Sequence, residues 1–301
     1  MKISEDGKQT WVYQHMSANG LSFRVAVAGI GDQLLLCLHG FPESALSWRY
    51  QLTPLWQAGY RVWAPDLRGY AGTSKPNGLN AYQLEQLLDD VTALLDMAQA
   101  RQVFLAGHDW GGIIAWYYAM RHPTRIQALI ILNAPHPACF EREVRRWHQL
   151  RRSWYMLACQ LPWLPEWILA AGQARLIGTI FDIMRRSPES IPVNIVQQYR
   201  QQAAEPGALT AMLNYYRAAL RGGGAFRQRR LGYPVIQLPT LVLWGRHDQA
   251  LSRENLVGLD RYVTDLTVIP FPHAGHFVHE DDPQRVTGEI LRWLSDRFPR
   301  T

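Results

Sequence analysis

The segment G-H-D-W-G-G, residues 107–112, constrains the fold of this chain more than any other stretch. It follows a short apolar run, 103–106, and precedes a helix-like segment, 113–120. A buried strand, a sharp turn between small residues, and a helix together form a nucleophile elbow, which presents its central side chain in a strained conformation. We expect Gly107 and Gly111 to be glycine because the strand and helix backbones approach closely there. The predicted turn exposes Asp109.

Apolar runs alternate with helical patterns along most of the chain. Runs at 34–38, 61–64, 103–106, 128–132 and 241–244 are typical of strands buried on both faces. Segments 11–16 and 21–28 flank Asn19-Gly20 and predict a hairpin. Helical spacing from 84 to 98 predicts a helix with Asn80 as its N-cap, and Asp282-Pro283 predicts the start of a last helix ending near Arg297. This alternation indicates the α/β class, with a mostly parallel, doubly wound sheet.

The alternation stops between about residues 136 and 238. This stretch is helix-like, aromatic and basic, with joints at Leu-Pro-Trp-Leu-Pro, 161–165, and at three glycines, 222–224. We therefore predict a helical cap, residues 136–237, inserted into a core formed by residues 1–135 and 238–301.

The composition is that of a globular protein, with 48% hydrophobic and 19% charged residues in 301. The net charge of +6 comes almost entirely from arginine, with basic clusters at 142–152 and 221–230. An anionic partner, either nucleic acid or a membrane surface, is one interpretation. A solvated helix face is the preferred one, because no nucleic-acid motif accompanies the charge, and we expect no nucleic-acid partner.

Three irregularly spaced cysteines, at 37, 139 and 159, suggest reduced thiols in a cytoplasmic protein. The segment Met1–Lys8 lacks the apolar core of a signal peptide, and no run approaches the roughly 20 apolar residues of a transmembrane segment. No Cys/His spacing resembles a zinc site, so we expect no metal.

An elbow nucleophile should be followed along the chain by an acid and then by a histidine. His276 is the preferred base because Gly275 permits a tight turn before it, although His247, His273 and His279 are alternatives. Asp248 follows the predicted strand 241–244, where open α/β sheets place their sites. The other place for the acid carries Asn133, which cannot act as a carboxylate, so Asp248 is favoured.

Acyl-type chemistry on a carboxylate also needs two backbone N–H groups that hold an oxyanion. Trp110, the residue after Asp109, provides one. The loop His39-Gly40-Phe41-Pro42 follows a buried strand, and we assign the second N–H to Phe41, since Pro42 has none. A carboxylate in the elbow attacks a carbon atom and leaves an ester on the enzyme itself.

Five segments in order resemble the α/β-hydrolase-fold epoxide hydrolases of the soluble, aspartate-nucleophile type. They are H-G-F-P-E-S (39–44), D-L-R-G-Y-A-G-T-S (66–74), G-H-D-W-G-G (107–112), N-A-P-H-P (133–137) and G-H-F (275–277). The cap segments Q-L-P-W-L-P-E (160–166) and L-N-Y-Y-R (213–217) are also similar to that family. The resemblance implies an α/β-hydrolase fold with an inserted cap and conversion of a small apolar epoxide and water into a vicinal diol, without a cofactor.

In that family two cap tyrosines bind the epoxide oxygen and donate protons to it. The resemblance assigns these roles to Tyr155 and Tyr216. Independently of the family, a phenol with a pKa of about 10 stays protonated at neutral pH and can donate to a developing oxyanion. The alternative is that both tyrosines only line an apolar pocket, together with Phe41 and Trp110.

Two other functions remain open at this point. A haloalkane or haloacid dehalogenase of the same fold shares the aspartate nucleophile, although haloalkane dehalogenases usually carry Asn where this chain has Phe41. A non-catalytic ligand-binding protein of the same fold would be expected to lack a triad residue, whereas Asp109, Asp248 and His276 are all present. The sequence does not indicate the particular epoxide, the stereochemistry or the oligomeric state.

Overall fold

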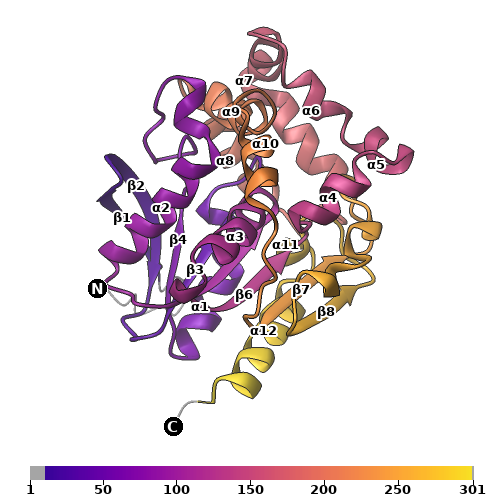
Figure 1. The fold of residues 1–301 in the computed structure, drawn as a ribbon. Helices are drawn as coiled ribbons and strands as arrows, with labels where there is room; N and C mark the ends of the chain where they lie inside the picture. Colours follow the sequence, from indigo (N-terminus) through magenta and orange to yellow (C-terminus); the bar gives the residue numbers. More distant parts are fainter. Residues whose placement is uncertain (1–10, 300–301) are drawn as a thin grey trace.

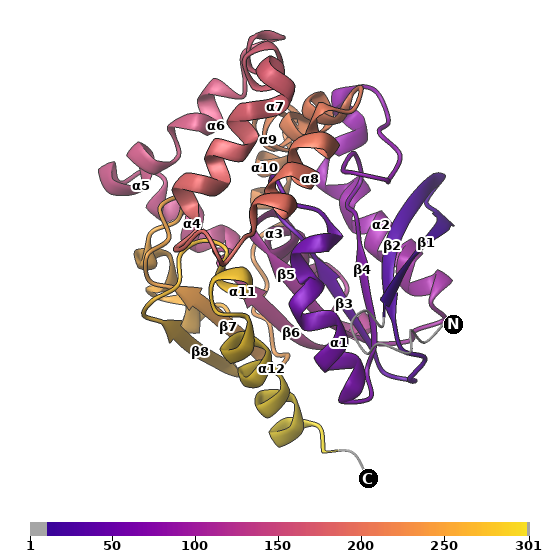
Figure 2. The same ribbon diagram turned by 180° about the vertical axis from the view of Figure 1, so that it is seen from behind.

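The computed structural model describes residues 11–299, in which eight strands form one sheet (Figures 1 and 2). The strands are β1 (Trp11–Ala18), β2 (Leu21–Ala28), β3 (Leu34–Leu38), β4 (Arg61–Pro65), β5 (Val103–His108), β6 (Ile126–Leu132), β7 (Thr240–Gly245) and β8 (Leu266–Phe271). Their order is β1-β2-β4-β3-β5-β6-β7-β8, and only the β1–β2 and β2–β4 pairs are antiparallel. The predicted α/β class with a mostly parallel sheet is confirmed. The predicted core begins at residue 1 and ends at residue 301, and residues 1–10 and 300–301 lie outside the described range. The segment Met1–Lys8, for which no signal peptide is expected, is among them.

Helices cover both faces of the sheet. The helices of the core are α1 (Arg49–Gln57), α2 (Leu84–Met97), α3 (Asp109–Arg121), α11 (Val278–Asp281) and α12 (Pro283–Arg297). In the two opposite views, α2 and α3 lie on one face, and α1 and α12 lie on the other (Figures 1 and 2). This double cover explains why every residue of β3, β5 and β7 is buried and why their sequences are nearly uninterrupted apolar runs.

Two details differ from the sequence-based expectation. Strand β8 is not among the strands predicted from apolar runs. It lies at the edge of the sheet and is only partly buried, so its sequence does not need to be continuously apolar. Asn80 is not the N-cap of α2. That position is Gln83, whose side-chain amide donates to Asn80 Oδ1 at 2.9 Å. The N-cap position of α12 is Asp282, as predicted.

Seven helices lie between β6 and β7 in the described part of the chain, and they pack above the carboxyl ends of the strands (Figure 1). They are α4 (Pro137–Glu143), α5 (Trp147–Arg152), α6 (Trp154–Ala158), α7 (Leu164–Met184), α8 (Val193–Ala204), α9 (Ala208–Arg221) and α10 (Gly224–Leu231). We refer to this insertion as the cap. Its division from the core at residues 136 and 237 stays a prediction.

Helix α7 is the one helix among the described residues that is long and apolar enough to cross a membrane by length and composition. No transmembrane segment is expected from the sequence. However, the backbone is non-helical from Ala171 to Ala174, so that α7 consists of two shorter helices joined by a kink. Neither part has the roughly 20 residues that a span needs.

Candidate active site

The structure places Asp109 at a tight turn between β5 and α3, with a φ of +47°. A Cβ atom on Gly107 would lie 2.4 Å from the Gly111 carbonyl oxygen, and one on Gly111 would lie 2.2 Å from that of Leu38. Both glycines are therefore required by close backbone contact, as predicted. A non-glycine residue at positive φ costs about 1–3 kcal/mol and persists only where the surrounding fold imposes it. The turn is thus a strained elbow that exposes one carboxylate.

The two carboxylate oxygens of Asp109 have different surroundings. The backbone N–H of Phe41 donates to Oδ1 at 2.9 Å, whereas Oδ2 lies 3.6 Å from His276 Nε2. The loop after β3 approaches so closely that a Cβ on Gly40 would lie 2.4 Å from the Asp109 Cβ. Trp110 lies in the first turn of α3, where backbone N–H groups lack an intrahelical acceptor. Phe41 and Trp110, the two predicted N–H donors, therefore both adjoin Asp109.

His276 and Asp248 meet at the same edge of the sheet. His276 Nδ1 lies 2.8 Å from Asp248 Oδ2, and both side chains are buried. The other oxygen of Asp248, Oδ1, accepts the backbone N–H groups of Ala250 and Leu251, each at 2.8 Å. Asp109, Asp248 and His276 thus follow β5, β7 and β8, and the predicted triad is assembled in space. The alternatives His247 and His273 are exposed.

The charges of this cluster shift the pKa values of its members. Burial disfavours the imidazolium form of His276, but the charge and hydrogen bond of Asp248, with the charge of Asp109, outweigh it and raise the pKa of His276 to about 9. Burial likewise disfavours the Asp248 carboxylate, yet His276 and the surrounding donors hold its pKa below the usual value. The cluster therefore stabilises a positive charge on the ring beside Asp109.

Asn133 belongs to the site, although the sequence predicts no role for it beyond occupying the place of an alternative acid. Its side-chain amide donates to Asp248 Oδ2 at 2.7 Å, and its Oδ1 accepts the backbone N–H of Gly245 at 2.9 Å. The residue is fully buried and follows β6 directly. Asn133 therefore orients the acid and ties the ends of β6 and β7 together. A polar residue at a strand end was the signal for it.

A second buried polar cluster contacts the backbone of His276. His108 Nδ1 lies 2.7 Å from Glu43 Oε2, and His108 Nε2 lies 2.9 Å from the backbone oxygen of His276. His279 Nε2 lies 3.4 Å from Glu43 Oε1. Glu43, His108 and His279 lie close enough to share a metal ion. However, both ring nitrogens of His108 already contact protein oxygens, so the cluster is better understood as a support for the His276 backbone.

The two predicted tyrosines come from different cap helices, contact each other and lie within the influence of the Asp109 charge. The rings of Tyr155 on α6 and Tyr216 on α9 are 5.8 Å apart, edge to face, and the Tyr216 ring also contacts Phe41 and Trp110. Burial and then negative charge, including that of Asp109, raise the pKa of both phenols. Within residues 11–299 neither hydroxyl has a recorded protein hydrogen-bond partner. Both phenols are therefore protonated donors with free hydroxyl groups.

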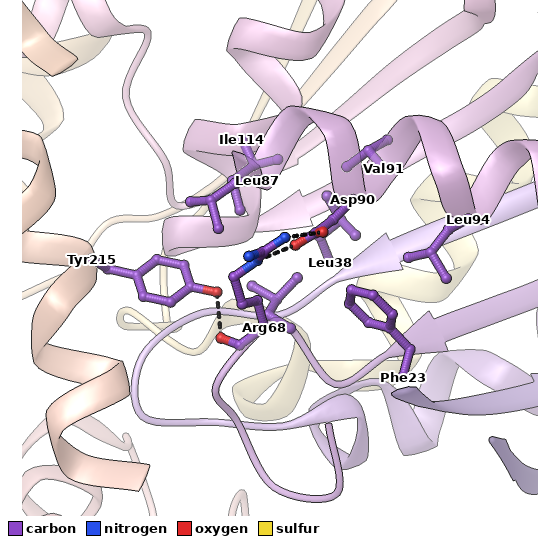
Figure 3. A pocket seen from close by; sticks show the side chains of 10 residues that line it. Phe23, Leu38, Arg68, Leu87, Asp90, Val91, Leu94, Ile114 and Tyr215 are labelled. Atoms are coloured by element: carbon purple, nitrogen blue, oxygen red, sulfur yellow. Dashed lines mark hydrogen bonds and ion pairs between the residues drawn. The ribbon is translucent and has the colours of Figure 1, made fainter. Parts of the chain in front are cut away.

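The neighbouring Tyr215 has a structural role. Its hydroxyl donates to the Arg68 backbone oxygen at 2.8 Å, next to the ion pair between Arg68 and Asp90 (Figure 3). The cavity drawn there has a volume of about 10 Å³, at the limit for one water molecule, and does not include Asp109. Tyr215 therefore anchors α9 to the core, and Tyr216 is the tyrosine of the pair whose ring contacts Phe41, the residue that donates to Asp109.

Comparisons with known proteins agree with this geometry. Residues 33–283 match the family described as the alpha/beta hydrolase fold. The AB hydrolase superfamily protein YfhM of Bacillus subtilis is 34% identical over 286 residues, which are 94% of this chain and 98% of that protein. Epoxide hydrolase 3 of Xenopus tropicalis is 35% identical over 297 residues, which are 95% of this chain and 78% of that protein.

Solved structures are similar over the same extent. A crystal structure of the Bacillus megaterium epoxide hydrolase in complex with an inhibitor superposes with a TM-score of 0.84 at 29% sequence identity. The match covers 94% of this chain and all of that one. The similarity therefore spans the core and the cap together.

Proposed function

The chain belongs to the alpha/beta hydrolase fold family and is a hydrolase, and from this premise we propose that it converts an epoxide into a vicinal diol through an ester on Asp109. The observation that carries the proposal is the pairing of an elbow carboxylate with two free phenols, Tyr155 and Tyr216, on the opposite side of the site. Epoxide opening needs a nucleophile at carbon and a proton donor at oxygen. A site with both can catalyse it without a metal.

In the first step Asp109 Oδ2 attacks one epoxide carbon from the side opposite the ring oxygen. The carbon–oxygen bond breaks, and its electron pair goes to the ring oxygen, which takes a proton from Tyr155 or Tyr216. The hydrogen bond from Phe41 to Oδ1 supports this assignment of the oxygens, since Oδ1 then becomes the ester carbonyl oxygen and is already held by an N–H donor.

In the second step water hydrolyses the ester. His276, oriented by Asp248, removes a proton from water, and the hydroxide attacks the carbonyl carbon of the Asp109 ester. The N–H groups of Phe41 and Trp110 stabilise the oxyanion. Its collapse breaks the bond to the substrate oxygen, which takes the proton from His276, so that the diol leaves. The proton of the re-formed Asp109 carboxyl group returns to the tyrosinate. Ester formation has removed the negative charge of Asp109, which contributes to the raised pKa of His276. Alkylation therefore makes the ring easier to deprotonate at the point where a base is required.

Labelled water tests the ester directly. A single turnover in H₂¹⁸O should leave ¹⁸O in the peptide that contains Asp109, because water attacks the carbonyl carbon and not the substrate. Unlabelled peptide together with labelled diol would mean that water opens the epoxide directly. The Asp109→Asn variant should form no diol in the same assay, and Asp96→Asn, on the exposed side of α2, is the matched control.

The dehalogenase alternative makes a different prediction. It uses the same aspartate ester but needs donors for a halide ion, and tyrosines that protonate an epoxide oxygen are not part of that requirement. A parallel set of epoxides and haloalkanes, scored for diol and for free halide, separates the two. Diol without halide supports the proposal, whereas halide release with inert epoxides would replace it.

A further inference from the structure

The outer edge of the cap exposes an unusual number of large apolar side chains. Helices α5, α6 and the first part of α7 follow one another along this edge, away from the core (Figures 1 and 2). We call this surface the cap rim and define it by six side chains, each between 48% and 74% exposed: Trp147, Trp154, Leu157, Leu161, Trp163 and Trp167. Contiguous exposed apolar side chains on a soluble fold mark an interaction surface.

The rim is a well-anchored surface. The inner side of α5 is fastened to the core by the buried Gln149, whose side chain contacts the backbone of Ala250 and Ser252 at 2.9 Å each. The 159–166 segment is fastened by Arg217, which donates to the backbone oxygens of Cys159 and Leu161 at 2.8 and 2.7 Å. The outward position of the rim tryptophans therefore follows from how these helices are anchored.

The charge around the rim is strongly positive. Residues 144–181 contain five arginines and a single acidic residue, Glu166. The carboxylate of Glu166 is engaged by Arg217 at 2.5 and 2.9 Å. Arg151 and Arg175 are exposed, and no ion pair is recorded for either within the part of the chain that the structure describes. The rim thus combines tryptophan, leucine and unneutralised arginine.

This combination identifies the partner chemically. Tryptophan is enriched at the headgroup level of membranes, and arginines on a polar flank bind the anionic headgroups. The exposed leucines, Leu157 and Leu161, can insert into lipid but give a nucleic acid neither a charge nor a stacking face. We propose that the cap rim docks on the surface of a bilayer that contains anionic phospholipid, with its tryptophans among the headgroups and its arginines on the lipid phosphates.

Docking would bring the candidate site close to the bilayer. The short helix α6 carries Tyr155 on its inner side, and Trp154 and Leu157 on its exposed side. The helix that carries Tyr155, whose ring contacts Tyr216, is therefore the one that would lie against lipid. The docking itself does not depend on the proposed function, since it requires only the exposed side chains.

Sedimentation with vesicles tests the proposal on the full chain. Vesicles of phosphatidylcholine mixed with phosphatidylglycerol should bind the protein, and vesicles of phosphatidylcholine alone should bind it much more weakly. Raising the salt to about 1 M, where the Debye length falls to about 3 Å, should release most of it. Brominated lipid should quench tryptophan emission in the bound state.

Variants locate the binding surface. Trp154→Ser/Trp163→Ser should lose most of the vesicle binding and of the quenching. Ile30→Ser/Val257→Ser removes two equally exposed apolar residues from the core and should change neither. Arg151→Gln/Arg175→Gln should weaken binding by about fivefold for each arginine. Arg101→Gln/Arg292→Gln, on the core and away from the cap, is the charge control.

Three results would overturn the proposal. The first is the absence of binding to anionic vesicles at low salt by a protein whose circular dichroism shows that it is folded. The second is equal loss of binding in the rim and core variants. The third is a concentration-dependent dimer in sedimentation velocity that the Trp154→Ser/Trp163→Ser variant abolishes, without vesicle binding, which would assign the rim to a second copy of the chain.

Discussion

Replacement of Asn133 by alanine should both destabilise the fold and slow the second chemical step. The substitution removes the charge-assisted hydrogen bond to Asp248 Oδ2 and leaves the buried N–H of Gly245 without its acceptor. A hydrogen bond to a charged group contributes about 1.5–3 kcal/mol, and an unsatisfied buried donor costs about 1–3 kcal/mol. We expect a loss of about 3 kcal/mol in the free energy of unfolding.

For a chain of this length that loss corresponds to a melting temperature about 5 °C lower. Thermal unfolding followed by circular dichroism measures it. Asn194→Ala is the matched control, since Asn194 is exposed on α8, and it should melt within about 1 °C of the parent.

The chemical effect follows from the pKa values. Loss of the Asn133 donor raises the pKa of Asp248 and loosens its orientation, so the acid supports His276 less well. Single-turnover experiments should therefore show slower hydrolysis of the ester, with ester formation less affected. An Asn133→Ala protein that melts with the parent and hydrolyses the ester at the parental rate would refute this account of the acid.

Further predictions concern the individual steps. His276→Gln should form the Asp109 ester without hydrolysing it, so that intact-mass analysis shows the protein heavier by one substrate; normal turnover of this variant would eliminate His276 as the base. Tyr216→Phe should slow ester formation by about 100-fold, the effect of removing one oxyanion donor, and should leave ester hydrolysis nearly unchanged; equal slowing of both steps in rapid-quench measurements would be inconsistent with a proton donor. Ester hydrolysis should increase with pH as His276 loses its proton, with an apparent pKa below the value of about 9 in the resting protein, because the ester no longer carries the Asp109 charge. Hydrolysis of the trapped ester across a pH series, compared with an NMR titration of His276, tests this; a profile that rises only at or above pH 9 would contradict it.

Much of the core could be predicted because the short sequence patterns of its strands and turns favour the same structure as their packing in the sheet. The elbow, the hairpin at Asn19-Gly20 and the strands buried on both faces each have a short-range pattern that the doubly wound sheet reinforces. The grouping of Asp109, Asp248 and His276 could be predicted for the same reason, since all three follow strands at one edge of the sheet.

The remaining features depend on contacts that no local pattern encodes. Asn133 is informative only once β6 lies beside β7 and its amide reaches Asp248. Glu43 and His108 are 65 residues apart and meet only because β3 and β5 are neighbours in the sheet. The N-cap of α2 was misassigned because Asn80 and Gln83 both have side chains able to cap, and tertiary packing decides between them. The kink in α7 has no sequence signal beyond Gly172.

Because Asp109 has a positive φ, the folded state is less stable than it would be with glycine at this position. Glycine at position 109 would relieve the steric conflict, yet it would remove the only group there that can form a bond to carbon. The proposed nucleophilic role of Asp109 therefore sets selection for reactivity against selection for stability at this residue. A screen that rewards heat resistance alone should accept replacements at position 109 that a screen for turnover rejects.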